Sequence, residues 1–266
     1  NSAPIYNDAS GTNSVAVKAS QSITFPAMLP QPVNSTFTLP ATASSGLPVT
    51  YSTSTPNRCT ISGSTANLLS PGYCGVYASQ PGNSNFFAAA TVGRNIDIVK
   101  EAQTIAFPST PPQLANSTFT LAATSSSGLP ITYTSTTPSI CTISGSTANP
   151  LAAGDCGIHA SQPGNSLYAA ASTVSRNIQI VKASQIITFT PMPAQPANTT
   201  FTLAATASSG LPVTYATSTP SICTISGGTA NLLATGYCGI YASQPGNSIY
   251  AAATTVGRNL QVLPAY

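Results

Sequence analysis

The sequence predicts an all-β protein made of three tandem β-sandwich repeats, each with one internal disulfide. Three observations lead to this expectation: a strict period of 82 residues, one pair of cysteines in each period, and short segments in which apolar and polar residues alternate. Together they indicate repetition of one small β unit.

The six cysteines fix the period, because they form two series with the same spacing. The series are Cys59, Cys141, Cys223 and Cys74, Cys156, Cys238. We place the repeats at residues 18–99, 100–181 and 182–263, and the short tail up to residue 266 is assigned to the third domain. Each repeat has the length of a small all-β domain with one modest core.

Residues 1–17 form an N-terminal arm whose sequence matches the end of a repeat. Val15, Ala16 and Val17 fall in register with Ile96–Val99, in the expected last strand of the first repeat. We therefore expect an orphan last strand that pairs with a sheet edge of another copy and links subunits by strand addition. Alternatively, the arm folds back on the first repeat or is the trimmed end of a longer array.

The expected strands follow from alternation and from turn residues. In the first repeat, residues 36–43 alternate, Ser44-Ser45-Gly46 supplies a turn, and a strand begins at Pro48. Further strands are expected at residues 22–25, 59–63, 65–69, 72–79 and 95–99. About seven short strands favour an immunoglobulin-like sandwich, and three such units an elongated array. No segment has a helical apolar period, so we expect almost no helix.

The cysteines are expected to pair within each repeat. Cys59 is in phase with Ile61, and Cys74 is in phase with Val76, so both thiols point toward the predicted core. Of the fifteen pairings open to six cysteines, the simplest uses the same positions in every repeat. These pairs are Cys59–Cys74, Cys141–Cys156 and Cys223–Cys238. Disulfides indicate an oxidising compartment, so we expect a secreted chain at an extracellular or cell-surface location.

Several motifs recur in order in all three repeats. In the first they are Gln-Ser-Ile-Thr-Phe from residue 21, Ser-Gly-Leu-Pro-Val-Thr-Tyr from 45, Cys-Thr-Ile-Ser-Gly from 59, Gly-Tyr-Cys-Gly-Val-Tyr-Ala-Ser-Gln-Pro-Gly-Asn from 72 and Ala-Ala-Ala-Thr-Val from 88. With these motifs, residues 18–263 resemble the bacterial extracellular immunoglobulin-like repeats of long secreted and surface proteins. The resemblance implies a β-sandwich and a role in stalks, adhesins or fibres, and it implies no catalytic residues.

Charged side chains are scarce, with seven Lys and Arg, four Asp and Glu and one His in 266 residues. The acidic residues Asp8, Asp97, Glu101 and Asp155 are scattered, and His159 stands where the other repeats have tyrosine. Because catalysis and metal binding need converging titratable groups, we expect no enzyme activity, no cofactor and no metal site. A zinc site would find only two thiolates in each repeat.

The same composition argues against two classes of partner. The net charge of +3 comes from well-separated Lys and Arg, so there is no basic stripe for nucleic acid. No apolar run approaches the length of about 20 residues that a helix needs to insert across a membrane. Nucleic acid and membrane are therefore not expected as partners.

The best candidate for a contact surface is a strand whose tyrosines are in opposite phase to the cysteine and therefore point outward. The candidate interface residues are Tyr73 and Tyr77 in the first repeat, Asp155 and His159 in the second, and Tyr237 and Tyr241 in the third. Two tyrosines on either side of a glycine offer flat apolar area with a polar tip, which suits a protein contact or stacking on sugar rings. Alternatively, a neighbouring loop or repeat covers them.

An Asn-X-Thr sequence recurs at one periodic position, at Asn34, Asn116 and Asn198. In a eukaryotic secretory protein these would be possible glycosylation sites on the surface. The interpretation that we favour is a polar turn just before a strand.

Two functions fit the sequence. The first is a structural subunit of an extracellular filament, fibre or sheath that self-assembles into a polymer through strand addition and tyrosine contacts, since sparse charge leaves little repulsion between copies. The second is an adhesin stalk or a carbohydrate- or protein-binding module of a large surface protein, with glycans or surface proteins as partners. A filament subunit should polymerise without ligand, whereas a stalk or lectin should stay monomeric and respond to its ligand.

Overall fold

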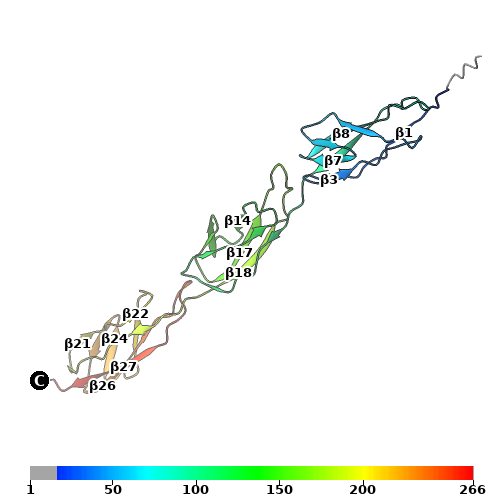
Figure 1. The fold of residues 1–266 in the computed structure, drawn as a ribbon. Helices are drawn as coiled ribbons and strands as arrows, with labels where there is room; N and C mark the ends of the chain where they lie inside the picture. The colour runs from blue at the N-terminus through cyan, green and yellow to red at the C-terminus, as the bar shows by residue number, and fades with distance from the viewer. Residues whose placement is uncertain (1–16, 266) are drawn as a thin grey trace, which may run out of the picture. The chain divides into compact units, whose positions relative to one another are not determined.

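The computed structural model describes residues 17–265 (Figure 1). Its described residues contain 27 short strands and no helix, as the alternating pattern predicted. The 82-residue period is visible in the strands, because each strand of the first repeat has a counterpart in the other two.

The strand bounds are as follows. The first repeat contains β1 (Ile23–Thr24), β2 (Gln31–Pro32), β3 (Thr36–Thr38), β4 (Thr42–Ala43), β5 (Thr50–Thr53), β6 (Cys59–Ser62), β7 (Thr65–Leu68), β8 (Gly72–Ser79) and β9 (Val92–Val99). The second contains β10 (Ile105–Ala106), β11 (Gln113–Leu114), β12 (Phe119–Thr120), β13 (Thr124–Ser125), β14 (Thr132–Ser135), β15 (Cys141–Ser144), β16 (Thr147–Pro150), β17 (Gly154–Ser161) and β18 (Val174–Val181). The third contains β19 (Ile187–Thr188), β20 (Gln195–Pro196), β21 (Thr200–Thr202), β22 (Thr206–Ala207), β23 (Thr214–Thr217), β24 (Cys223–Ser226), β25 (Thr229–Leu232), β26 (Gly236–Ser243) and β27 (Val256–Leu263).

Each repeat forms two facing sheets and one short extra pair of strands. In the first repeat the larger sheet has the strand order β2-β9-β8-β5, and the smaller sheet has the order β3-β7-β6. Strands β1 and β4 pair antiparallel, whereas β2 runs parallel to β9. The larger and smaller sheets of the other repeats are β11-β18-β17-β14 with β12-β16-β15, and β20-β27-β26-β23 with β21-β25-β24. This topology confirms the predicted sandwich class.

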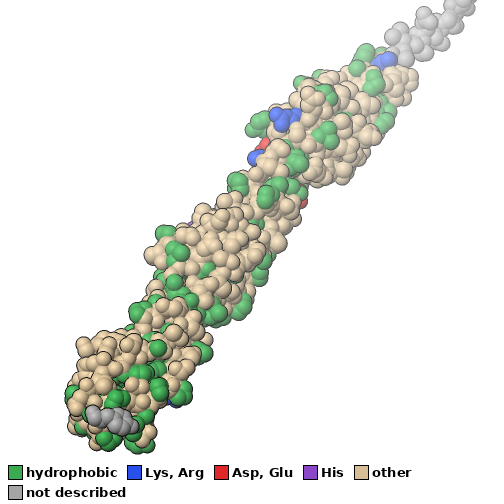
Figure 2. Space-filling view, turned by 90° about the vertical axis from the view of Figure 1, so that its left-hand side faces the viewer, with side chains coloured by type: hydrophobic (Ala, Val, Ile, Leu, Met, Phe, Trp, Pro, Cys, Tyr) green, Lys and Arg blue, Asp and Glu red, His purple; other side chains and the backbone are tan. Residues whose placement is uncertain are grey.

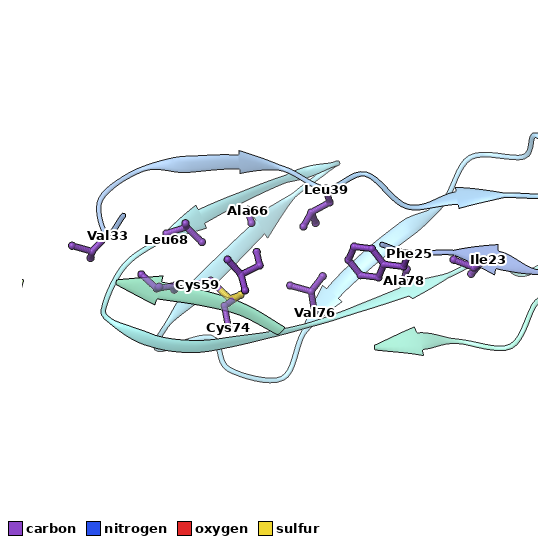
Figure 3. Packing of buried hydrophobic residues seen from close by; sticks show 12 residues of the cluster. Ile23, Phe25, Val33, Leu39, Cys59, Ala66, Leu68, Cys74, Val76 and Ala78 are labelled. Carbon is purple, nitrogen blue, oxygen red and sulfur yellow. A yellow bond between two sulfur atoms is a disulfide. The ribbon is translucent and has the colours of Figure 1, made fainter. Parts of the chain in front are cut away.

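Alternate side chains of the two sheets meet in a core inside each repeat. Figure 3 shows the core of the first repeat, where Leu39, Ala66, Leu68 and Val76 gather around the disulfide. Leu68 is 1% exposed and Val76 is fully buried. Matching clusters fill the second and third repeats. Each repeat therefore buries its own apolar face, which is the main source of folding free energy for such a unit.

The three disulfides join the cysteines as predicted. They are Cys59–Cys74, Cys141–Cys156 and Cys223–Cys238, each with a sequence separation of 15. Cys59 on β6 belongs to the smaller sheet and Cys74 on β8 belongs to the larger one, so the bond crosses the core and ties the two sheets together (Figure 3). Disulfides persist in oxidising compartments, which fits the predicted extracellular location.

The prediction of one strand over residues 36–43 is wrong, because the structure divides this segment into β3 and β4 of different sheets. The break lies where Tyr51 makes hydrogen bonds to the backbone: its hydroxyl accepts from the Ala41 amide at 3.0 Å and donates to the Leu39 carbonyl at 3.0 Å. A side chain thus satisfies backbone groups that would otherwise need a strand partner. The other repeats have the same tyrosine in the same role.

Further strand predictions need correction. The strand expected to begin at Pro48 begins at Thr50. The last strand of the first repeat begins at Val92 rather than at Asn95. The short strand β2 was not expected, because its pairing with the end of β9 is parallel and joins segments far apart in the sequence. A strand of two residues is too short to show an alternating pattern, and a partner far away in the sequence leaves no local signal.

The described residues divide into two compact units. One comprises the residues up to Gln103 together with Pro163–Ala171, and the other comprises Thr104–Gln162 and the residues from Ser172 onward. The loop Pro163–Ala171 of the second repeat therefore belongs to the same unit as the first repeat. The predicted domain boundaries follow the sequence period and stay a prediction.

Stability is expected to depend little on pH until tyrosine ionises. With four carboxylic side chains and one histidine, few groups can bind protons differently in the folded and unfolded chain. Burial raises the pKa of Tyr51 above its ordinary value, and the hydrogen bond with the Ala41 backbone lowers it by less. A group with a raised folded-state pKa stabilises the fold below its unfolded pKa, and this contribution disappears as pH rises through the folded pKa.

We therefore expect the melting temperature to change by no more than a few degrees between about pH 4 and pH 9. Above about pH 10 it should fall. Calorimetric melts across this range check the expectation. A fall of more than about ten degrees at pH 4 would contradict it, because that result requires a coupled buried acid.

Candidate functional site

The tyrosines of the candidate interface lie on the outer face of β8 in the first repeat and of β26 in the third. Tyr73 and Tyr77 are 67% and 44% exposed, and Tyr237 and Tyr241 are 61% and 46% exposed. The cysteine between each pair is fully buried. The alternation of the strand therefore places the rings outward, where they are accessible to a partner.

One tyrosine of each pair packs against a glycine of the adjacent strand. Tyr77 is opposite Gly93 of β9, and a Cβ atom at Gly93 would lie 3.2 Å from Tyr77 Cε1. Tyr241 has the same relation to Gly257 of β27, at 3.1 Å. The glycine leaves room for the ring to rest on the strand. Sequence reasoning missed these glycines, although they occur in the two repeats that carry the tyrosines.

A shallow, open hollow lies beside each of these rings. The lining residues are Gly75, Val76, Tyr77, Gly93, Arg94 and Asn95 in the first repeat, and Gly239, Ile240, Tyr241, Gly257, Arg258 and Asn259 in the third. Arg94 is fixed by a hydrogen bond that its Nε donates to the Phe25 carbonyl at 2.9 Å, and Arg258 is fixed in the same way by Phe189 at 2.9 Å. An aromatic ring, an oriented guanidinium and an amide can stack on and hydrogen-bond to a sugar or a peptide.

The glycine between the two tyrosines has a structural role. A Cβ atom at Gly75 would lie 2.5 Å from Ser54 Oγ, so a side chain here would require the Ser54 hydroxyl to turn away. The backbone amide of Gly75 donates a hydrogen bond to Thr55 Oγ1 at 3.0 Å. The outer face between Tyr73 and Tyr77 is therefore partly covered by the segment that follows β5.

The second repeat presents polar groups on the same face. Asp155 and His159 are exposed on β17, and His159 is opposite Ser175 of β18 rather than a glycine. The aromatic face is thus a property of the first and third repeats. Figure 2 shows how few Lys, Arg, Asp and Glu side chains interrupt the surface in one view.

The three Asn-X-Thr positions are exposed on the turn between two short strands. Asn34 and Asn198 have φ values of 61°, in the left-handed region that asparagine tolerates better than other residues with a side chain. Asn116 is exposed at the matching position. The backbone conformation agrees with the favoured interpretation, a polar turn, and glycosylation stays a prediction.

The proposed assembly strand lies almost wholly outside the described residues. Val15 and Ala16 fall in the part of the chain that is not described, and Val17 is 89% exposed and belongs to no strand. Strand addition by residues 1–17 therefore stays a prediction.

The described part of the chain holds no cluster of potential metal ligands. No three or more His, Cys, Asp and Glu side chains gather there as a metal site would require. Across residues 17–265 there is also no helix with the length and apolar character of a membrane span.

No family model matches this chain, and no curated protein matches it. Three solved structures illustrate its similarities. Domains 1–6 of surface layer protein SbsC share 14% identity over 92% of this chain and 40% of that one, with a TM-score of 0.31. The human desmocollin-1 ectodomain shares 10% sequence identity over 92% of this chain and 62% of its own length, with a TM-score of 0.35. The D00-D0 domains of intimin share 16% sequence identity over 58% of this chain and 98% of their own length, with a TM-score of 0.27. The chain thus spans two fifths of the length of the surface layer structure.

The facing sheets, the disulfide between them and the threefold repetition define the class of this protein. It is a tandem array of three β-sandwich repeats, each with one disulfide between its two sheets. This assignment rests on the sheets and cores of the chain itself.

Proposed function

We propose that the chain is a structural subunit of an extracellular filament, fibre or sheath, and that its copies contact one another through the tyrosine faces. The observation that carries the proposal is the recurrence of two exposed tyrosines at the same positions of the first and third repeats. Tyrosine is enriched at protein interfaces, where its ring contributes contact area and its hydroxyl a hydrogen bond.

Two properties of the chain support this function. A surface with few charges offers little electrostatic repulsion to the approach of a second copy (Figure 2). In addition, each repeat has its own buried core and its own disulfide, so each repeat has its own source of stability. Strand addition by residues 1–17 is a second contact in the same proposal.

The hollows beside Tyr77 and Tyr241 favour a second candidate function, the binding of glycans or surface proteins. Each hollow combines a ring with an arginine that is already held in position, so little side-chain entropy is lost when a ligand binds. In this case the array would serve as an adhesin stalk or a binding module.

The test of the proposed function is electron microscopy of the purified, oxidised chain without ligand, which should show regular polymers. We expect replacement of the four tyrosines, Tyr73→Ser, Tyr77→Ser, Tyr237→Ser and Tyr241→Ser, to reduce polymer mass by about tenfold or more, because tyrosine is enriched among the interface residues whose truncation costs about 2 kcal/mol or more. Sedimentation measures the polymer mass.

The matched control is Leu29→Ser with Ile186→Ser, which removes apolar side chains that are 79% and 68% exposed elsewhere on the surface. This control should polymerise like the wild type. Polymers that persist in the four-tyrosine variant would show that these faces are not the contact. A monomeric wild type whose melting temperature rises with a glycan would favour the binding module instead.

A further inference from the structure

A loop in the third repeat is seated on the end of the second. Ile249, at the tip of this loop, packs against the core of the second repeat. Next to it, the Ser248 carbonyl accepts a hydrogen bond from the Ala153 amide at 2.9 Å. Ile140 lies beside this point, because a Cβ atom at Gly154 would be 3.0 Å from Ile140 Cδ1. These contacts form a repeat-to-repeat joint within one compact unit.

The base of the loop is held rigidly by its own repeat. The Ala183 amide donates to the Ile249 carbonyl at 2.8 Å, and the Ala251 amide donates to the Ala183 carbonyl at 2.9 Å. Two buried glutamines hold the strands around it, since Gln185 Nε2 donates to Gln244 Oε1 at 3.2 Å. The loop is therefore built to present its tip to the preceding repeat.

The first repeat has a loop with the same backbone hydrogen bonds but with a polar residue at its tip. The Ala19 amide donates to the Asn85 carbonyl at 2.8 Å, and the Phe87 amide donates to the Ala19 carbonyl at 2.9 Å, as in the third repeat. The tip residue, however, is the exposed Asn85 in place of Leu167 and Ile249, which are both partly buried. Phe87 beside it is 57% exposed.

The receiving end of the third repeat resembles that of the second, with one polar change. Ile222 occupies the position of Ile140 and lies beside Gly236, where a Cβ atom would be 3.3 Å away. The exposed Thr235 stands in place of Ala153. A polar residue thus replaces an apolar one at this end, just as Asn85 replaces an isoleucine at the tip of the first loop.

We propose that the end of the third repeat binds the first repeat of a second copy, with the tip loop around Asn85 seated at Ile222 and Thr235. The Thr235 amide donates to the Ser84 carbonyl of that copy, as the Ala153 amide donates to Ser248. Asn85 then lies near Thr235, at the positions that Ile249 and Ala153 occupy in the joint within the chain. This head-to-tail contact is heterologous, and a contact of this kind generates an open filament when its rotation does not close.

This inference rests on the proposed filament function and names its axial contact, whereas the tyrosine faces supply lateral contacts. A single loop buries less surface than a stable complex needs, so the contact is weak by itself. Inside the chain the joint is strengthened by covalent linkage. Between copies it is strengthened by the many contacts of a polymer.

The test uses the full oxidised chain and places like charges on the two sides of the contact. The variant with Asn85→Lys and Thr235→Lys should associate about tenfold or more weakly than the wild type in sedimentation velocity, because two lysines face each other at every head-to-tail contact. The variant with Asn85→Asp and Thr235→Lys should regain association. Both positions are exposed, so the fold tolerates the changes. Thr224→Lys, an exposed position on β24, is the control for the added charge and should match the wild type.

The possible results separate this inference from the function on which it rests. Loss in the double-lysine variant together with recovery in the aspartate–lysine variant supports it. If the wild type assembles and the double-lysine variant assembles equally, the head-to-tail contact is overturned and the filament function stands. The contact is also overturned if the double-lysine variant loses association and the aspartate–lysine variant does not regain it. An equal loss of association in the control Thr224→Lys overturns it as well. A wild type that stays monomeric at the highest soluble concentration overturns both.

Discussion

Replacing both cysteines of the first repeat, Cys59→Ala with Cys74→Ala, is expected to lower the free energy of unfolding of that repeat by about 3 kcal/mol. The bond closes a loop with a sequence separation of 15, and a cross-link of this length removes about that much chain entropy from the unfolded state. For a domain of this size, each kcal/mol corresponds to about 4–8 °C, so the transition should move down by roughly 12–24 °C.

Differential scanning calorimetry measures this change, because each repeat has a separate core and can contribute its own transition. The matched control is Cys223→Ala with Cys238→Ala, which should move the transition of the third repeat instead. A uniform fall of the whole melting profile in both variants would contradict independent stabilisation. A shift below about 5 °C would show that the bond stabilises far less than its loop length implies.

The fold class and the disulfides could be predicted because both depend on local phase. Cys59 shares its phase with Ile61, and Cys74 shares its phase with Val76, so the two thiols had to face one core. The threefold repetition then removed the ambiguity among pairings. The structure places these cysteines on different sheets of the sandwich, which phase alone does not decide.

The break in the first long strand could not be predicted, because the alternation continues through it. Leu39 and Ala41 both point toward the core, on either side of the place where the chain changes sheets. The change is decided by Tyr51, whose hydroxyl bonds to the backbone at the break. A tertiary contact thus overrides a regular local pattern.

The candidate site was predicted in part. Outward phase located Tyr73 and Tyr77 correctly on the outer face of a strand, but it gave no sign that Gly93 would seat a ring or that Arg94 would be fixed beside it. These two residues come from the adjacent strand, and sequence reasoning had not paired it with the tyrosine strand. The signal available was the recurrence of the same glycine in the third repeat, at Gly257.

The repeat-to-repeat joint was also missed, although the sequence carries a trace of it. Between the matching loops, the tip changes from Asn85 to Leu167 and Ile249, and the exposed Phe87 changes to Ala169 and Ala251. The polar-to-apolar change at the tip marks a position that is exposed in one repeat and partly buried in the other two. The surface that covers this position is shown by the structure, in which Ile249 packs against the core of the second repeat and Leu167 against that of the first.

The loop that carries this joint should be the most sensitive backbone segment of the third repeat. Gly246 has a φ of +78°, and a Cβ atom there would lie 2.3 Å from the Tyr250 carbonyl oxygen and 2.7 Å from the Ala251 carbonyl carbon. Both neighbours are backbone atoms, so they cannot yield as a flexible side chain would. We expect Gly246→Ala to cost roughly 2–5 kcal/mol, from about 1–2 for the left-handed conformation and about 1–3 for the overlap.

The matched control is Gly210→Ala, at a turn with a φ of +75° where a Cβ atom would meet nothing within 4 Å. This variant should lose only the conformational part, about 1–2 kcal/mol. Chemical denaturation measures both costs, and hydrogen exchange of the Ala153 and Ala183 amides reports on the joint, since both donate to the loop. Gly246→Ala should speed exchange at both amides, whereas Gly210→Ala should leave it unchanged. Equal costs in the two variants would mean that close backbone approach does not require this glycine, and unchanged exchange would mean that the loop holds the joint without its present conformation.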